Sequence, residues 1–189
     1  MLETLKEIDT LWFLWINSHH TTALDWTMWT LSQRWSWAVV IVLAFVLLTL
    51  RKEPRRWWRV LATSVLCFLL ADQGSVLIKN IVCRPRPCHA LTDVYMFRTR
   101  CGGEYGFVSS HAANAFALLT LLWMRYRRHT LAVLLMALWA LTTCYSRIYL
   151  GKHYPGDVVC GALFGAVVGI VVYALTTMIE KKLKKSETK

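Results

Sequence analysis

The hydrophobic positions of this chain fall into five long runs separated by short polar connections. The runs cover residues 36–50 (extended N-terminally by 31–35), 57–82, 107–124, 130–145 and 158–179. Each run can cross about 30 Å of hydrocarbon at about 1.5 Å per residue, the shorter ones with tilt or local thinning of the bilayer. The pattern therefore predicts an all-α, polytopic membrane helix bundle with about five transmembrane helices.

The first 30 residues follow a different pattern. In LETLKEIDTLWFLWIN the apolar residues recur at helical spacing, but charges interrupt them at Glu3, Lys6, Glu7 and Asp9. Such a helix is typical of the membrane interface rather than of a span. The acidic residues also occupy the place of a basic n-region, so we expect no cleavable signal peptide. Residues 1–30 are therefore predicted to form an interfacial amphipathic region.

The composition of the chain agrees with a bilayer environment. The 189 residues are 56% hydrophobic and 17% charged, they include ten Trp, and the mean hydropathy is +0.40. A soluble domain of this length could not bury so much apolar surface, which argues against a soluble all-helical protein. The length is that of a single domain.

The net charge of +11 arises from clusters between the runs. More than half of the Lys and Arg residues lie in 51–59, 125–128 and the tail 181–189. With five crossings these segments share one side, which the positive-inside rule makes cytoplasmic. The tail then faces anionic lipid headgroups, and no nucleic-acid partner is expected. The loops 83–106 and 146–157 open on the opposite side, together with the N-terminal helix.

The cysteines suggest one disulfide and no metal site. Cys88 and Cys101 lie in the long outer loop, where an oxidising compartment would allow them to pair; free thiols are the alternative. No Cys/His grouping has the spacing of zinc ligands, so no metal is expected.

Three polar clusters stand at the predicted outer ends of the spans, within KNIVCRPRP, GFVSSHAA and SRIYLGKHYPGD. Their charged and hydrogen-bonding residues are Lys79, Arg84, Arg86, Ser109, Ser110, His111, Arg147, His153 and Asp157. Taken singly, a Lys at a helix end reaches headgroups, a Ser caps a helix, and a His–Asp pair stabilises a surface. Taken together, cations around a helix start form an anion site, and phosphate fits it best.

The two histidines supply chemistry to such a site. Pro155 suits the first turn of the last span, which places Asp157 within reach of the His153 ring. A carboxylate on one ring nitrogen fixes the tautomer and leaves the other nitrogen as a base or nucleophile. His111 arrives on another helix and is free to act as a general acid. The combination predicts phosphoryl transfer without a metal or another cofactor.

These motifs resemble those of the type 2 phosphatidic acid phosphatase (PAP2) superfamily of integral-membrane lipid phosphatases. The matching segments are Lys79 to Pro87 for K-x6-R-P, Val108 to His111 for P-S-G-H, and Ser146 to Asp157 for S-R-x5-H-x3-D. Val108 and Ser110 depart from the usual Pro and Gly. We expect variation within the family rather than loss of activity, because every charged motif residue is present.

The resemblance implies a role for each motif residue. His153 would be the nucleophile that forms a phosphohistidine, with Asp157 orienting it. His111 would protonate the leaving group and then activate water. The phosphoryl oxygens would be held by Lys79, Arg86, Ser109, Ser110 and Arg147. The catalytic core would span 57–179, followed by a basic cytoplasmic tail over 180–189. Lys152 matches no motif position.

The resemblance also implies hydrolysis of a lipid phosphate at the periplasmic face of the bacterial inner membrane. Small bacterial members include lipid A, undecaprenyl-diphosphate and phosphatidylglycerophosphate phosphatases. Lipid A is preferred, because Arg84, Arg98 and Arg100 add cations for a headgroup with more than one phosphate; undecaprenyl diphosphate is the next choice. Vanadate-dependent haloperoxidases resemble the same anion site but are soluble and larger. A non-catalytic lipid-binding protein would be expected to lack one of the catalytic residues.

Overall fold

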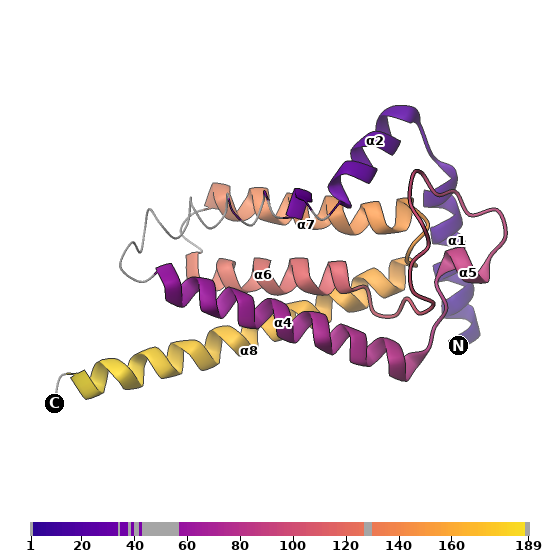
Figure 1. Ribbon diagram of the computed structural model, residues 1–189. Helices are drawn as coiled ribbons and strands as arrows, with labels where there is room; N and C mark the ends of the chain where they lie inside the picture. The colour runs from indigo at the N-terminus through magenta and orange to yellow at the C-terminus, as the bar shows by residue number, and fades with distance from the viewer. Residues whose placement is uncertain are drawn as a thin grey trace.

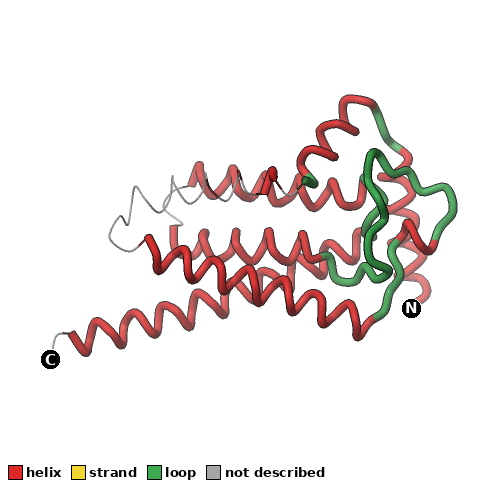
Figure 2. The backbone as a smooth tube through the Cα atoms, viewed as in Figure 1, coloured by secondary structure: helices red, strands yellow, loops and turns green. Residues whose placement is uncertain are grey.

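The computed structural model describes residues 2–33, 35–37, 39, 42, 57–126 and 130–187, and these residues form helices and loops without a named strand. The helices are α1 (Leu2–Ser18), α2 (Thr22–Leu31), α4 (Trp57–Val82), α5 (Pro87–Ala90), α6 (Ser110–Tyr126), α7 (Thr130–Tyr149) and α8 (Pro155–Glu187). The long helices α4, α6, α7 and α8 run side by side, and α1 lies across one end of their bundle (Figure 1). The longest described loops gather at that same end (Figure 2).

Three helical stretches in the described part of the chain are long and apolar enough to cross a bilayer. They are Trp57–Val82, Leu131–Tyr149 and Pro155–Leu183, and each coincides with a predicted run. α6 is shorter than the run predicted over 107–124, because residues 107–109 belong to the preceding loop. The span predicted over 36–50 falls almost wholly outside the described residues.

α8 extends beyond the predicted end of the last span. The expected tail over 180–189 is helical as far as Glu187. Its sequence is rich in Lys and also contains Glu, and both favour helix, so the tail prolongs α8 rather than forming a separate segment. The basic end of α8 lies at the opposite end of the bundle from α1 (Figure 1).

α6 occupies the centre of the described bundle and packs against α4, α7 and α8. Gly161, Gly165 and Gly169 recur every four residues on α8 and face the backbone of α6. A Cβ at Gly161 would lie 2.6 Å from the Ser109 carbonyl oxygen, and one at Gly165 would overlap the Ala113 carbonyl oxygen. This close approach fixes the start of α8 beside the start of α6.

The outward faces of the long helices are lined with apolar side chains. Exposed examples are Leu69, Leu77, Leu134, Leu138, Leu163 and Val167. A continuous apolar exterior of this kind is suited to lipid rather than to water.

α1 is apolar on both its outer and inner sides. Leu11, Trp12 and Trp15 are exposed, whereas Phe13 is fully buried. The Phe13 ring packs edge-on against Tyr154, with ring centroids 5.5 Å apart. An exposed face with two Trp is typical of a helix at the membrane interface. Its inner face contacts the turn between α7 and α8.

The loop between α5 and α6 is closed by a disulfide. Cys88 and Cys101 are joined, with Cα atoms 5.8 Å apart, so the pairing suggested by the sequence is confirmed. The N–H of Gly106 donates to the Arg84 carbonyl oxygen at 2.8 Å and brings the two ends of the loop together. The loop therefore folds back over the ends of α6 and α8.

The contact between α6 and α8 predicts the effect of a larger side chain at Gly165. Gly165→Val overlaps the α6 backbone, which we expect to cost at least about 1–3 kcal/mol and to lower the melting temperature in detergent. Gly103→Val is the control, since no atom lies within 4 Å of a Cβ there. Equal melting temperatures for both variants would contradict this packing.

Candidate active site

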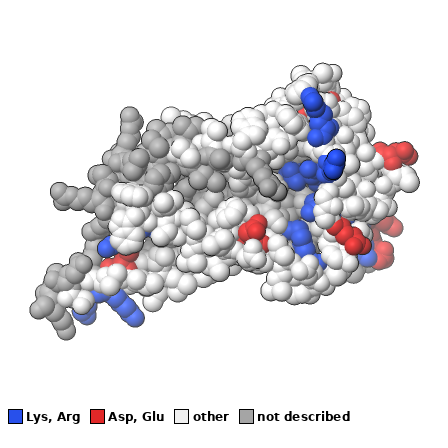
Figure 3. Space-filling model, viewed as in Figure 1, with Lys and Arg blue, Asp and Glu red and all other residues white. Residues whose placement is uncertain are grey.

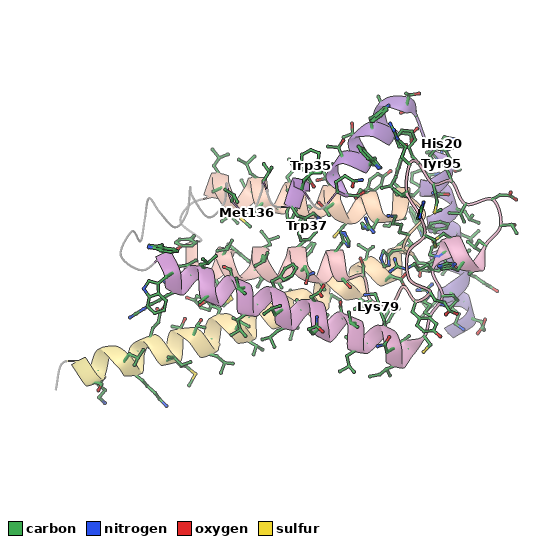
Figure 4. The ribbon with its side chains drawn as sticks, viewed as in Figure 1. His20, Trp35, Trp37, Lys79, Tyr95 and Met136 are labelled. Carbon is green, nitrogen blue, oxygen red and sulfur yellow. A yellow bond between two sulfur atoms is a disulfide. The ribbon has the colours of Figure 1, made fainter. Side chains whose placement is uncertain are left out.

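Segments far apart in the sequence meet at the end of the bundle covered by α1 (Figure 1). The last turns of α4 carry Lys79, and the extended chain that follows carries Arg86. The start of α6 carries 109–111, and the connection from α7 to α8 carries 147–157. Figure 4 labels Lys79 at this end of α4, and Lys and Arg side chains gather at the same end of the surface (Figure 3).

A tight turn between α7 and α8 places His153. Gly151 has a φ of +75°, which glycine adopts readily, and a Cβ there would lie 2.9 Å from the Tyr95 carbonyl oxygen. The N–H of His153 donates to the Arg147 carbonyl oxygen at 3.2 Å. Pro155 then begins α8, as its fixed φ predicts. The turn leaves His153 only 2% exposed.

The two ring nitrogens of His153 face opposite charges. Nε2 lies 2.9 Å from Arg86 Nη1, which can only donate, so Nε2 is the acceptor. The proton of a neutral ring is therefore assigned to Nδ1, which faces Asp157 Oδ2 at 3.6 Å. That distance is an electrostatic contact rather than a hydrogen bond. The same Oδ2 accepts the N–H of Tyr154 at 3.0 Å, which holds the carboxylate in place.

The surroundings keep His153 neutral at pH 7. Burial lowers its pKa well below the usual 6.5, and the charges of Arg86, Arg147 and Lys79 lower the pKa further. A protonated ring would add another positive charge to this group. Nε2 therefore carries a lone pair rather than a proton. This lone pair accepts the hydrogen bond from Arg86, and it can attack an electrophile that takes the place of that donor.

Besides Nδ1 of His153, two buried donors in the motifs have no hydrogen-bond partner within the described part of the chain. Ser109 is fully buried, and its Oγ is unpaired although serine commonly caps a helix start. Its N–H donates to the Asp157 carbonyl oxygen at 2.9 Å. Arg147 is 5% exposed, and its Nε is also unpaired. Burying such groups unpaired costs about 1–3 kcal/mol each, so both indicate a place for an oxyanion.

Backbone contacts hold Arg86 beside the turn. Its Nε donates to the Gly103 carbonyl oxygen at 2.7 Å, and its Nη1 to the Lys152 carbonyl oxygen at 3.2 Å. Lys152 belongs to the same cluster of charge, because burial together with Arg147 and Arg86 lowers its pKa to about 8. Positive charges held this closely repel one another, and a bound anion relieves that repulsion.

His111 approaches the site from another helix. It lies in the first turn of α6, is half-buried, and packs edge-on against Trp37, with ring centroids 5.5 Å apart. The side chains of His153 and Arg147 interact electrostatically with the His111 ring. The structure therefore brings the second histidine near the first on a separate element, which allows it to serve a leaving group or a water molecule.

Lys79 is held by a series of hydrogen-bonded polar side chains, most of which lie outside the motifs. Lys79 Nζ donates to Ser110 Oγ at 2.5 Å, and Ser110 Oγ lies 2.7 Å from Ser75 Oγ. Ser75 Oγ donates a hydrogen bond to the Asp72 carbonyl oxygen. The Asp72 carboxylate accepts a hydrogen bond from Asn114 Nδ2 at 2.9 Å. Ser110 thus anchors Lys79, which explains what its hydroxyl does in place of the usual Gly. The signal that could have revealed this series is an Asp inside an apolar run.

The three arginines that were predicted to add cations for the lipid headgroup lie in different surroundings. They are Arg84, Arg98 and Arg100. Arg84 donates to Asp157 Oδ1 at 2.8 Å and to Asp9 Oδ2 at 2.7 Å. It therefore belongs to the carboxylate side of the site rather than to a headgroup surface. The guanidinium of Arg98 lies over an indole ring of α2 at 4.8 Å. Arg98 and Arg100 are both exposed on the loop.

Comparison with known proteins identifies a family and named relatives. The family model described as PAP2 superfamily matches residues 56–181. The chain is 35% identical over 193 residues to the lipid A 4′-phosphatase of Bacteroides thetaiotaomicron, an alignment covering 97% of this chain and 84% of that protein. It is 29% identical over 183 residues to the lipid A 4′-phosphatase of Porphyromonas gingivalis, covering 91% and 74%.

A solved structure shares the fold. The PAP2-type phosphatidylglycerolphosphate phosphatase from Bacillus subtilis superposes with a TM-score of 0.72 at 16% identity, covering 93% of this chain and 88% of that one. This likeness supports the helical architecture of the described residues.

The unpaired donors predict binding of a free oxyanion. We expect tungstate to bind the purified protein, and Ser109→Ala and Arg147→Lys each to weaken binding by roughly 10-fold or more, since each removes a hydrogen bond to a charged group. Isothermal titration in detergent measures the dissociation constants. Arg100→Gln, at an exposed position, is the control. Unchanged affinity in both site variants would contradict an oxyanion site at these donors.

Proposed function

The chain belongs to the PAP2 superfamily and is a membrane lipid phosphatase, and from this premise we propose that it removes a phosphate from lipid A. The observation that carries the chemistry is the neutral, buried His153, whose Nε2 faces Arg86 at 2.9 Å. The choice of lipid A, and of its 4′-phosphate, is supported by the relative of that name that aligns with nearly the whole chain.

The first half of the proposed reaction transfers the phosphoryl group to His153. Nε2 attacks phosphorus in line with the bond to the sugar oxygen, that bond breaks, and His111 donates a proton to the leaving oxygen. The phosphoryl group approaches the side of the ring that now faces Arg86. Asp157 faces Nδ1 and stabilises the positive charge that the ring gains.

The second half of the reaction restores His153. His111 takes a proton from water, the water oxygen attacks phosphorus, and the P–N bond breaks with its electron pair returning to Nε2. Inorganic phosphate then leaves. In both halves negative charge on the phosphoryl oxygens is met by Arg147 Nε and Ser109 Oγ, donors already in place without other partners in the described residues.

The proposed active site faces the periplasm of a bacterial inner membrane. It lies at the α1 end of the bundle, and the basic end of α8 lies at the other (Figure 1). The positive-inside rule assigns that basic end to the cytoplasm. The disulfide between Cys88 and Cys101, near the site, is typical of an oxidising compartment.

Phosphate release by the purified protein tests the substrate. Lipid A, undecaprenyl diphosphate and phosphatidylglycerophosphate are compared in detergent with EDTA present, and mass spectrometry locates the phosphate that lipid A loses. We expect the highest kcat/KM on lipid A, with loss at the 4′ position. Faster turnover of another lipid would contradict the assigned substrate. No turnover of any lipid would contradict the activity, and inhibition by EDTA would contradict a metal-free reaction.

Substitution of each histidine tests its role. We expect His153→Ala to lower kcat by at least about 10³-fold, because the nucleophile is lost, and His111→Ala to lower it by about 10²–10⁴-fold. His89→Ala is the control, since His89 is exposed on α5. Elution from a sizing column confirms folding. A kcat like that of the wild type in either site variant removes that residue from its assigned role.

A further inference from the structure

α1 is joined to the site by a line of three charged groups. Arg84 Nη2 donates to Asp9 Oδ2 at 2.7 Å, and Arg84 Nη1 donates to Asp157 Oδ1 at 2.8 Å. The side chain of Asp157 is fully buried, while those of Asp9 and Arg84 are 14% and 24% exposed. Solvent screening is therefore limited, and the charges act on one another more strongly than in a surface pair.

Asp9 also holds the turn that carries His153. Its Oδ1 accepts the N–H of Gly156 at 2.7 Å, and this N–H lies in the first turn of α8, where it has no partner within the helix. Gly156 permits the contact, because a Cβ there would lie 2.8 Å from Asp9 Oδ2. Arg84 in turn lies over the Tyr154 ring at 4.1 Å. α1 thus contacts the turn immediately after His153.

The charge of Asp9 matters because Arg84 would otherwise cancel the charge of Asp157. A carboxylate paired with one guanidinium presents no net charge to its surroundings. With Asp9 on the other side of Arg84, the three groups together carry one negative charge. This charge lies beside Nδ1 of His153, the ring that becomes positive when it takes the phosphoryl group.

We propose that Asp9 is a positioning residue for the phosphatase reaction, which balances Arg84 so that Asp157 presents a negative charge to His153. The inference rests on the proposed role of His153 as the nucleophile. Asp9 lies on α1, outside residues 56–181 that the family model matches, so the family motifs do not contain it.

Asp9→Asn separates the charge of this residue from its shape. The amide oxygen still accepts the Gly156 N–H, but the negative charge is gone. Loss of a donor that touches reacting atoms typically costs roughly 10²–10³-fold in kcat; because Asp9 acts through Arg84, we expect about 10-fold. KM should stay within about twofold of wild type, since Asp9 binds no substrate. Glu7→Gln, on the exposed side of α1, is the matched control.

A second substitution distinguishes charge from structural support. Adding Arg84→Gln to Asp9→Asn removes the cation and returns the net charge beside His153 to that of Asp157 alone. We therefore expect the double variant to have a higher kcat than Asp9→Asn. Purely structural contacts predict the reverse, because two are lost instead of one. Asp9→Glu and Asp9→Gln repeat the comparison with matched, longer side chains, and the Glu variant should be faster.

The outcomes separate this inference from the proposed function. Steady-state kinetics use p-nitrophenyl phosphate and the lipid that the wild type hydrolyses best, with concentrations corrected for the fraction that elutes folded. Absence of wild-type turnover overturns the proposed function and the role of Asp9 with it. With wild-type turnover established, an Asp9→Asn variant with wild-type kcat, or a double variant slower than the single one, overturns the role of Asp9 alone.

Discussion

The structure depends on holding several positive charges beside one buried, neutral histidine. Burial and three basic neighbours from different elements depress the pKa of His153. Like charges in a low-dielectric interior repel, and that cost must be offset by a counter-charge. The net negative charge of Asp9, Arg84 and Asp157 lies on the Nδ1 side of the ring, so it does not pair with Arg86 on the Nε2 side. A phosphoryl group supplies the missing negative charge, which makes the site favour the substrate and its transition state.

The helices keep this arrangement rigid. Glycines on α8 allow its backbone to touch α6, and the N–H of Ser109 bonds directly to the Asp157 carbonyl oxygen at 2.9 Å. The starts of the two helices are therefore fixed relative to each other before any ligand arrives. α1 adds a third support from outside the bundle through Asp9. Donors fixed in this way need little reorganisation when charge develops, which is the main electrostatic route to catalysis.

Much of this could be predicted from the sequence, because long apolar runs define helices and their polar ends must meet at one membrane face. The motif residues reached the expected end of the bundle, and the disulfide joined the expected cysteines. Side-chain partners were harder to predict. Asp9 has the same charge as the other acidic residues of α1, and its contact with the start of α8 distinguishes it from them in the structure. The direction of Arg84 and the contact between Ser110 and Ser75 likewise depend on neighbouring elements that no local pattern specifies.

The central claim is that the phosphoryl group passes through His153. Its most direct test is mass spectrometry of the His111→Ala variant quenched at alkaline pH during turnover of p-nitrophenyl phosphate. This leaving group needs no proton, so transfer to the enzyme proceeds while the attack of water is slowed. A phosphorylated peptide carrying the modification on His153 is predicted, absent when His153 is also replaced by Ala. Phosphate on another residue, or turnover without any phosphorylated peptide, would contradict the account.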